Sequence, residues 1–206
     1  DMGAGKGYLT FALYDYLHNK LKKKPKVLGI ELRSELVEKC NAIVEKAKFD
    51  HLSFEQGAIK EVVLPKIDVL MALHACDIAT DDAIARGIKD HAKVILAAPC
   101  CHKQIRNSMK NQGSLAALTK FGIMEARQAE ILTDTIRALI LESYGYKTKV
   151  FEFIATDHTP KNILIAAVKT KEIELPDPII KEQITTLKET FGISFHELER
   201  LMEIKN

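Results

Sequence analysis

The sequence predicts an α/β domain built on a mostly parallel β-sheet, and three observations support this prediction. Short apolar runs of strand length alternate with segments whose apolar residues recur at helical spacing. A glycine-rich turn opens the chain and is followed at once by a helical pattern. The chain has 206 residues, of which 47% are hydrophobic and 28% charged. This composition suits one compact core and excludes an intrinsically disordered protein.

The two patterns give the expected elements in chain order. Helical spacing of apolar residues predicts helices, and short apolar runs predict strands. The first part of the chain is expected to contain a helix over residues 8–17, a strand at 27–31, a helix over 36–47, strands at 52–56, 67–73 and 93–98, and a long helix over 123–143.

The rest of the chain is expected to form a hairpin and a helical tail. Residues 147–155 and 163–169 pair across the turn-rich sequence TDHTPKN. Pro176 and Pro178 then break the chain, and amphipathic patterns predict short helices at 179–189 and 194–204. We therefore expect a main domain over residues 1–170 and a C-terminal helical tail over residues 171–206.

The charge and the cysteine content say more about the cellular compartment of the protein than about its binding partner. Thirty basic and 28 acidic residues leave a net charge of +2, too small to identify a nucleic-acid partner, although a local basic patch would suffice for one. The dense run Lys20–Lys26 precedes a strand, so we interpret it as a solvated loop at the amino ends of the strands. Four unevenly spaced cysteines predict a reducing, cytoplasmic location, and no apolar run suggests a membrane partner.

The glycine turn Asp1-Met2-Gly3-Ala4-Gly5-Lys6-Gly7 stands where a strand should end and a helix begin. A dinucleotide fingerprint is excluded because its last glycine position falls on Tyr8. A P-loop is excluded because no serine or threonine follows Lys6. A strand should precede such a turn, so we expect a first strand in an N-terminal segment that is missing here. That segment is a candidate contributor to substrate recognition.

What remains is an acid, then G-x-G-x-G, then Glu31 at the end of the next strand. This pattern resembles the S-adenosylmethionine site of class I methyltransferases, and the resemblance covers about residues 1–170. It implies a Rossmann-like, mostly parallel seven-stranded sheet with an antiparallel closing strand. One departure is Gln56-Gly57-Ala58 after the third strand, where family members often have an acid. The resemblance implies that the cofactor contacts are Asp1, Gly3, Ala4, Gly5, Gly7, Glu31, Leu32, Gln56, Gly57, Ala58 and Leu73.

Reactive side chains follow the next two strands, in the sequences LHACD and APCCH. Since the carboxyl ends of parallel strands meet at one edge of the sheet, we expect these side chains to converge. With the glycine turn, these motifs resemble a methyltransferase group that includes the tRNA acceptor-stem 2′-O-methylase family and uncharacterised bacterial relatives. The resemblance implies an RNA acceptor, and Asp77 stands where the tRNA enzymes have glycine. The catalytic candidates are His74, Cys76, Asp77, Cys100, Cys101 and His102.

Two acceptor chemistries fit these residues. Ribose 2′-O transfer needs a general base, which Asp77 or His102 could provide, with Lys103 or Lys161 lowering the pKa of the hydroxyl. Transfer to a cytosine carbon needs a nucleophile, for which Cys100 is the candidate. On the long helix, Arg127, Asp134 and Arg137 could face the pocket, although an ordinary solvated face is the preferred interpretation.

Zinc is a further possibility, because the cysteines and histidines could supply tetrahedral ligands. Against it, C-x-x-C pairs are absent, and the side chains of the adjacent Cys100 and Cys101 should point apart. We therefore expect no metal. Two alternatives stay open: a non-catalytic methyltransferase-like module, which could contain zinc, and a methyltransferase that acts on protein.

Overall fold

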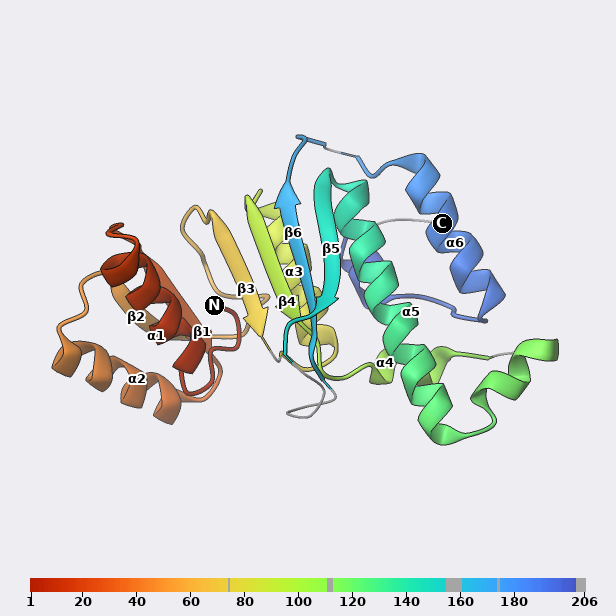
Figure 1. Ribbon diagram of the computed structural model, residues 1–206, viewed down its shortest axis with the longest axis horizontal. Coiled ribbons are helices and arrows are strands. Elements are labelled where there is room, and N and C mark those ends of the chain that lie inside the picture. The colour runs from red at the N-terminus through yellow and green to blue at the C-terminus, as the bar shows by residue number, and fades with distance from the viewer. Residues whose placement is uncertain (74, 111–112, 155–160, 174, 203–206) are drawn as a thin grey trace.

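The computed structural model describes residues 1–73, 75–110, 113–154, 161–173 and 175–202. Within them it shows the expected α/β fold, with helices packed around the strands (Figure 1). The strands are β1 (Val27–Glu31), β2 (Leu52–Gln56), β3 (Val69–Leu73), β4 (Val94–Ala98), β5 (Tyr146–Glu152) and β6 (Ile163–Lys169).

These strands form a parallel pair, β1 and β2, and a four-stranded sheet in the order β3-β4-β6-β5. β3 and β4 are parallel, whereas β6 runs antiparallel to both of its neighbours, β4 and β5. The expected closing hairpin and its antiparallel strand are therefore present. The described residues form six strands in two sheets, so the count of seven stays a prediction.

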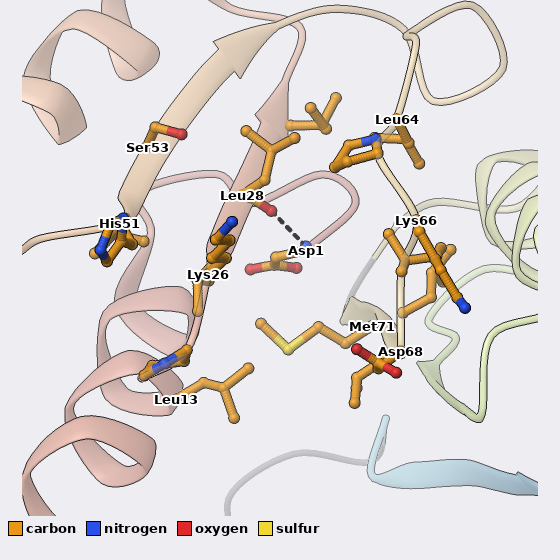
Figure 2. A pocket seen from close by; sticks show the side chains of 18 of the residues that line it. Asp1, Leu13, Lys26, Leu28, His51, Ser53, Leu64, Lys66, Asp68 and Met71 are labelled. Carbon is orange, nitrogen blue, oxygen red and sulfur yellow. Dashed lines mark hydrogen bonds between the residues drawn. The ribbon is translucent and has the colours of Figure 1, made fainter. Parts of the chain in front are cut away.

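The first three residues join the two sheets, because they lie between β1 and β3. Met2 forms a parallel bridge with Ile30, and the N–H of Met2 donates to the carbonyl of Met71 at 2.8 Å. Towards the amino ends of β1 and β3, a cavity of about 1070 Å³ lies between the two strands. Figure 2 shows this cavity, with the nitrogen of Asp1 donating to the carbonyl of Leu28 at 2.8 Å.

The helices confirm most of the expected elements. They are α1 (Tyr8–Asp15), continued by the π-helical turn η1 (Tyr16–Lys20), α2 (Ser34–Ala47), α3 (Ile78–Lys89), α4 (Lys103–Ser108), the 3₁₀ helix η2 (Gly113–Thr119), α5 (Gly122–Ser143), α6 (Pro178–Thr190) and α7 (Glu197–Leu201). The predicted elements did not include α3, although Ile84 and Ile88 recur at helical spacing on its buried side. Nor did they include α4, which has only six residues.

The C-terminal tail packs into the main core of the protein. Asp177 caps α6 by accepting a hydrogen bond from the N–H of Ile179 at 2.9 Å, and proline follows it at the first helical position. Ile184 and Leu198 are buried in the same apolar cluster as the strands β3, β4 and β6. α7 is shorter than expected at its amino end because His196 caps it there through the N–H of Leu198. Residues 203–206 of the predicted last helix lie outside the described residues.

A second, smaller apolar cluster supports the pair β1 and β2. It contains Tyr14 from α1, Val37 and Cys40 from α2, and Leu52 and Phe54 from β2. The glycine turn contacts both clusters, because Met2 is buried in the main cluster and Ala4 packs against the second. None of the helices in the described part of the chain has both the length and the apolar character of a membrane span.

Candidate functional site

The glycine turn is built on backbone conformations that side chains rarely allow. Gly3, Gly5 and Gly7 have φ angles of +77°, +59° and +73°. A Cβ atom at Gly5 would meet nothing within 4 Å, so the backbone there borders open space. A Cβ atom at Gly7 would lie 2.9 Å from the Phe54 ring, so Gly7 serves packing instead. Gly5 is therefore the position at which a ligand can approach the backbone.

Glu31 places a carboxylate against this turn. Its side chain is 7% exposed, and its Oε2 accepts the N–H of Gly5 at 2.8 Å. Its Oε1 accepts the backbone N–H and the Nε of Arg33, at 3.2 Å and 2.8 Å. Burial opposes ionisation, but these hydrogen bonds from Arg33 and Gly5 hold the pKa of Glu31 below its ordinary value. Glu31 is thus a carboxylate whose Oε2 keeps capacity for a second donor.

Asp1, the other acid of the predicted cofactor site, is turned towards α1. Its Oδ2 accepts the hydroxyl of Thr10 at 2.5 Å. The buried Thr10 therefore fixes this carboxylate beside the turn. The neighbouring Ala4 donates its N–H to the carbonyl of Ile30 at 2.9 Å, which ties the turn to β1.

The remaining cofactor candidates lie at the carboxyl ends of the strands. The side-chain amide of Gln56 donates to the carbonyl of Leu32 at 3.1 Å, and the N–H of Gly57 donates to the carbonyl of Glu31 at 3.1 Å. Leu32 is 67% exposed. Ala58 begins the turn after β2, and Leu73 ends β3 half-buried. The structure thus brings Glu31, Leu32, Gln56 and Gly57 together beside the glycine turn.

The glycine turn adjoins the segment that follows β3. A Cβ atom at Gly3 would lie 3.9 Å from the Cβ of Ala75, the residue before Cys76. The predicted cofactor site and the predicted catalytic cluster are therefore neighbours at one edge of the fold. His74, a catalytic candidate from the sequence, lies outside the described residues.

Cys76, Cys100 and Cys101 form a cluster of three sulfur atoms, which we call the cysteine triangle. The Sγ of Cys76 lies 3.7 Å from that of Cys100 and 3.8 Å from that of Cys101, and the Cys100 and Cys101 sulfurs are 3.8 Å apart. β3 and β4 end in register, with Leu73 opposite Ala98, so the segments after them meet. No cysteine of the chain forms a disulfide.

The expectation that the side chains of Cys100 and Cys101 point apart is wrong. Alternation of side chains holds only in extended strands, and β4 ends at Ala98, two residues before Cys100. Burial, together with the hydrogen bonds to Cys76 and Cys101, raises the pKa of the Cys100 thiol to about 12. A thiol that stays protonated at neutral pH is a weak nucleophile, which weakens the interpretation of Cys100 as the attacking group.

A buried ionic network lies behind the cysteine triangle. Arg137 on α5 is fully buried and binds both carboxylate oxygens of Asp81, at 2.8 Å and 3.0 Å. It also donates to Asp134 at 3.1 Å, and Asp134 pairs with the Nε2 of His102 at 3.2 Å. His102, a catalytic candidate, therefore lies in the network, with a side chain that is only 4% exposed.

This network corrects the interpretation of the long helix as carrying a solvated polar face. Asp134 and Arg137 are buried, whereas Arg127 is exposed. Asp81 was missed altogether, because it lies 56 residues from Arg137 and belongs to a helix that the sequence did not predict. No local signal in the sequence connects these two residues.

Asp77, the residue that precedes α3, has an unusual backbone conformation. Its φ and ψ are +50° and −117°, a backbone region that favours glycine. Its carbonyl accepts Nη2 of Arg137 at 3.0 Å, and its Oδ1 accepts the N–H of Gln104 at 3.4 Å. The half-buried Asp77 carboxyl thus stands beside the cysteine triangle.

The lysines expected near the site differ in their surroundings. Lys103 is exposed at the start of α4, after APCCH. Lys161 pairs with Glu130 of α5 at 2.8 Å. The run Lys20–Lys26 is exposed except at the half-buried Pro25, and it precedes β1, at the amino ends of the strands, as expected.

Comparison with known proteins gives the following likenesses. A family model described as "Methyltransferase domain" matches residues 1–108, which is more than half of the chain. No protein of curated function matches the chain. Among solved structures, an rRNA methylase from Streptococcus thermophilus superposes with a TM-score of 0.53 at 12% identity, over 83% of this chain and 85% of that one. The methyltransferase domain of bacterial CtHen1-C gives a TM-score of 0.52 at 13% identity, over 82% and 87% of the two chains. At these identities the likeness shows a shared Rossmann-like methyltransferase fold.

Proposed function

The chain belongs to the methyltransferase-domain family, and from this premise we propose that it transfers a methyl group from S-adenosylmethionine to RNA. The observation that carries the proposal is the glycine turn whose Gly5 borders open space while its N–H is bound to the Glu31 carboxylate. When bound, S-adenosylmethionine supplies an electrophilic methyl group on a sulfonium centre.

The residues at the turn fit this cofactor. The open backbone at Gly5 leaves room for a ligand against the turn. The free acceptor capacity of Glu31 Oε2 suits a ribose hydroxyl, and the exposed Leu32 next to it offers an apolar face for a base. The carboxylates of Asp1 and Glu31 favour the positive charge of a sulfonium over a pyrophosphate.

Asp77 is the general base in this proposal. It is half-buried, whereas His102 is enclosed in the ionic network behind it. Catalysis then depends mainly on placing the acceptor in line with the methyl group, while Asp77 accepts the proton of the ribose 2′-hydroxyl of the RNA. Asp77→Asn keeps an oxygen that can accept from Gln104, so we expect unchanged stability and a rate at least about 100-fold lower. An unchanged rate would remove Asp77 from the chemistry.

The RNA acceptor is supported by a basic region after APCCH, which we call the basic segment and define as residues 103–127. It carries five basic residues, Lys103, Arg106, Lys110, Lys120 and Arg127, and a single acid, Glu125. α4 and the start of α5 lie at the end of the molecule to which β3 points (Figure 1). Phe121 is 61% exposed, with the Nζ of Lys120 5.7 Å from its ring centre. Basic side chains beside an exposed aromatic ring suit phosphates and stacked bases.

Charge reversal in two places tests this assignment. The first variant carries Lys103→Glu, Lys110→Glu and Lys120→Glu, and the matched control carries Lys20→Glu, Lys22→Glu and Lys24→Glu. Both change the net charge equally, but the control lysines lie at the amino ends of the strands. We expect the first variant alone to lose at least about tenfold in affinity for rRNA or tRNA. Its salt dependence should become shallower by about 0.7 to 0.9 per lost phosphate contact.

The acceptor itself is identified by incubating the full chain with methyl-labelled S-adenosylmethionine and with rRNA, tRNA or total protein. The proposal expects label in RNA, and one of the proteins of similar fold is named an rRNA methylase. Label in protein alone, or equal loss of RNA affinity in the two charge-reversed variants, would overturn the RNA assignment while leaving methyl transfer in place.

A further inference from the structure

The spacing of the cysteine triangle is the spacing that a metal ion imposes on its ligands. The three Sγ atoms lie 3.7, 3.8 and 3.8 Å apart, so they form a nearly equilateral triangle. A tetrahedral zinc ion holds thiolate sulfurs at about 2.3 Å, which separates them from one another by about 3.8 Å. The three sulfurs therefore match one face of a zinc-thiolate tetrahedron.

We propose that Cys76, Cys100 and Cys101 bind one Zn²⁺ ion through three thiolates, a property that goes beyond the proposed methyl transfer. On binding, each of the three S–H bonds loses its proton to solvent and a Zn–S bond takes its place, with no change of oxidation state. Thiolate ligands favour zinc over hard cations such as Mg²⁺ or Ca²⁺.

The segments that carry the sulfurs are held from behind. Asp77, next to Cys76, has its carbonyl bound to Arg137, and His102, next to Cys101, is bound to Asp134. The N–H of Gln104 reaches Oδ1 of Asp77, which links the segment after β4 to the segment after β3. Because Arg137 and Asp134 belong to one helix and bind each other, the two segments share one support. Such outer contacts orient metal ligands before the ion arrives.

The fourth coordination position is open in the described part of the chain. No fourth cysteine, histidine or carboxylate there joins the three sulfurs as a ligand, and Cys76 is exposed. Three protein ligands with one open position is the arrangement of zinc sites that accept water or a substrate group. The cysteine triangle itself lies beside the proposed cofactor site, because Ala75, the residue before Cys76, adjoins Gly3.

The test begins with metal analysis of the full chain purified under reducing conditions without chelator, and again after added zinc and desalting. We expect one zinc per chain. Replacing zinc with Co²⁺ should give the thiolate-to-cobalt charge-transfer absorption. Cys100→Ser and Cys76→Ser should each weaken zinc binding by more than the about 10- to 100-fold that loss of an outer contact costs. Cys40→Ser is the matched control, because Cys40 is a buried cysteine of α2 outside the triangle.

Circular dichroism of each variant verifies folding, and Cys76→Ser changes an exposed side chain, so it keeps the test usable if Cys100→Ser does not fold. Zinc-free wild-type protein that does not take up added zinc would overturn the proposal. So would an equal loss of zinc in Cys40→Ser, or retention of full zinc affinity in both triangle variants. Binding of S-adenosylhomocysteine, measured on the same samples, reports separately on the proposed function.

Discussion

The glycine turn and the cysteine triangle adjoin at one edge of the fold, yet different interactions hold them in place. The turn is a backbone structure of seven consecutive residues, completed by Glu31 at the end of the next strand. The triangle is carried by segments that are fixed by side chains from α3 and α5, including an ion pair that spans 56 residues. The glycine turn therefore depends on residues that can adopt positive φ, whereas the cysteine triangle depends on the pairing of buried charges.

The largest expected effect comes from disrupting the buried ionic network that supports the cysteine triangle. Arg137→Ala leaves the buried carboxylates of Asp81 and Asp134 without their cation. We expect the free energy of unfolding, measured by urea denaturation, to fall by about 3–5 kcal/mol. Arg127→Ala on the same helix is the matched control, because Arg127 is exposed, and should change it by less than about 0.5 kcal/mol. Equal effects of the two substitutions would contradict the importance of the network.

The contrast between the glycine turn and the cysteine triangle explains which features the sequence could predict. The β-strands, α2 and α5 follow from periodic apolar residues, and the turn follows from glycine spacing, all of which are local signals. α3 was missed even though Ile84 and Ile88 give its buried face a helical spacing. The burial of Asp134 and Arg137 was missed because their partners, Asp81 and His102, are far away in the chain. Local patterns cannot distinguish a buried ionic face from a solvated one.

The glycine turn should lose its ligand affinity when Gly5 is replaced. Gly5→Asp places a carboxylate in the open space at Gly5 and against Glu31. Aspartate tolerates positive φ better than most residues, so the fold should persist at a cost of about 1–2 kcal/mol. We expect the affinity for S-adenosylhomocysteine to fall at least about 100-fold, about 2.7 kcal/mol, by calorimetry. Gly5→Asn, with the same shape and no charge, separates repulsion from steric filling, and an unchanged affinity in Gly5→Asp would exclude the turn as the cofactor site.

Acid should have a smaller effect on stability, and it should act through the buried His196. Burial, and after it the positive charges of Arg137 and Lys188, lower the pKa of His196 to about 3 against the opposing charge of Asp134. The unfolded chain therefore binds this proton first, at about pH 6.5, so the stability from the neutral imidazole is full above that pH and is lost as pH falls towards 3. Between pH 6 and 4 we expect a loss of up to about 1.4 kcal/mol per pH unit.

His196→Asn should remove most of this slope, because asparagine can still cap α7 but does not titrate. The exposed His51, changed to asparagine, which tolerates its φ of +65°, is the control and should leave the slope unchanged. Urea denaturation at several pH values measures both. An unchanged slope in His196→Asn would move the acid sensitivity to other groups.

The candidate site shows the same limit as the fold. Glycine spacing and the carboxyl ends of the strands correctly brought together the glycine turn, Glu31, Asp77 and the three cysteines. The sequence did not show that Cys100 and Cys101 turn their sulfurs to one another, because the strand that would separate them has already ended. It also did not show that His102 is enclosed, which depends on Asp134 from a distant helix.

The central claim is that the glycine turn with Glu31 binds the methyl donor, and calorimetric titration of the folded full chain with S-adenosylhomocysteine tests it most directly. We predict a single site with a dissociation constant of micromolar or tighter, about −8 kcal/mol, which Gly5→Asp removes. Absence of binding by the folded protein, or equal binding by Gly5→Asp, would contradict the account and leave a methyltransferase fold that serves another purpose.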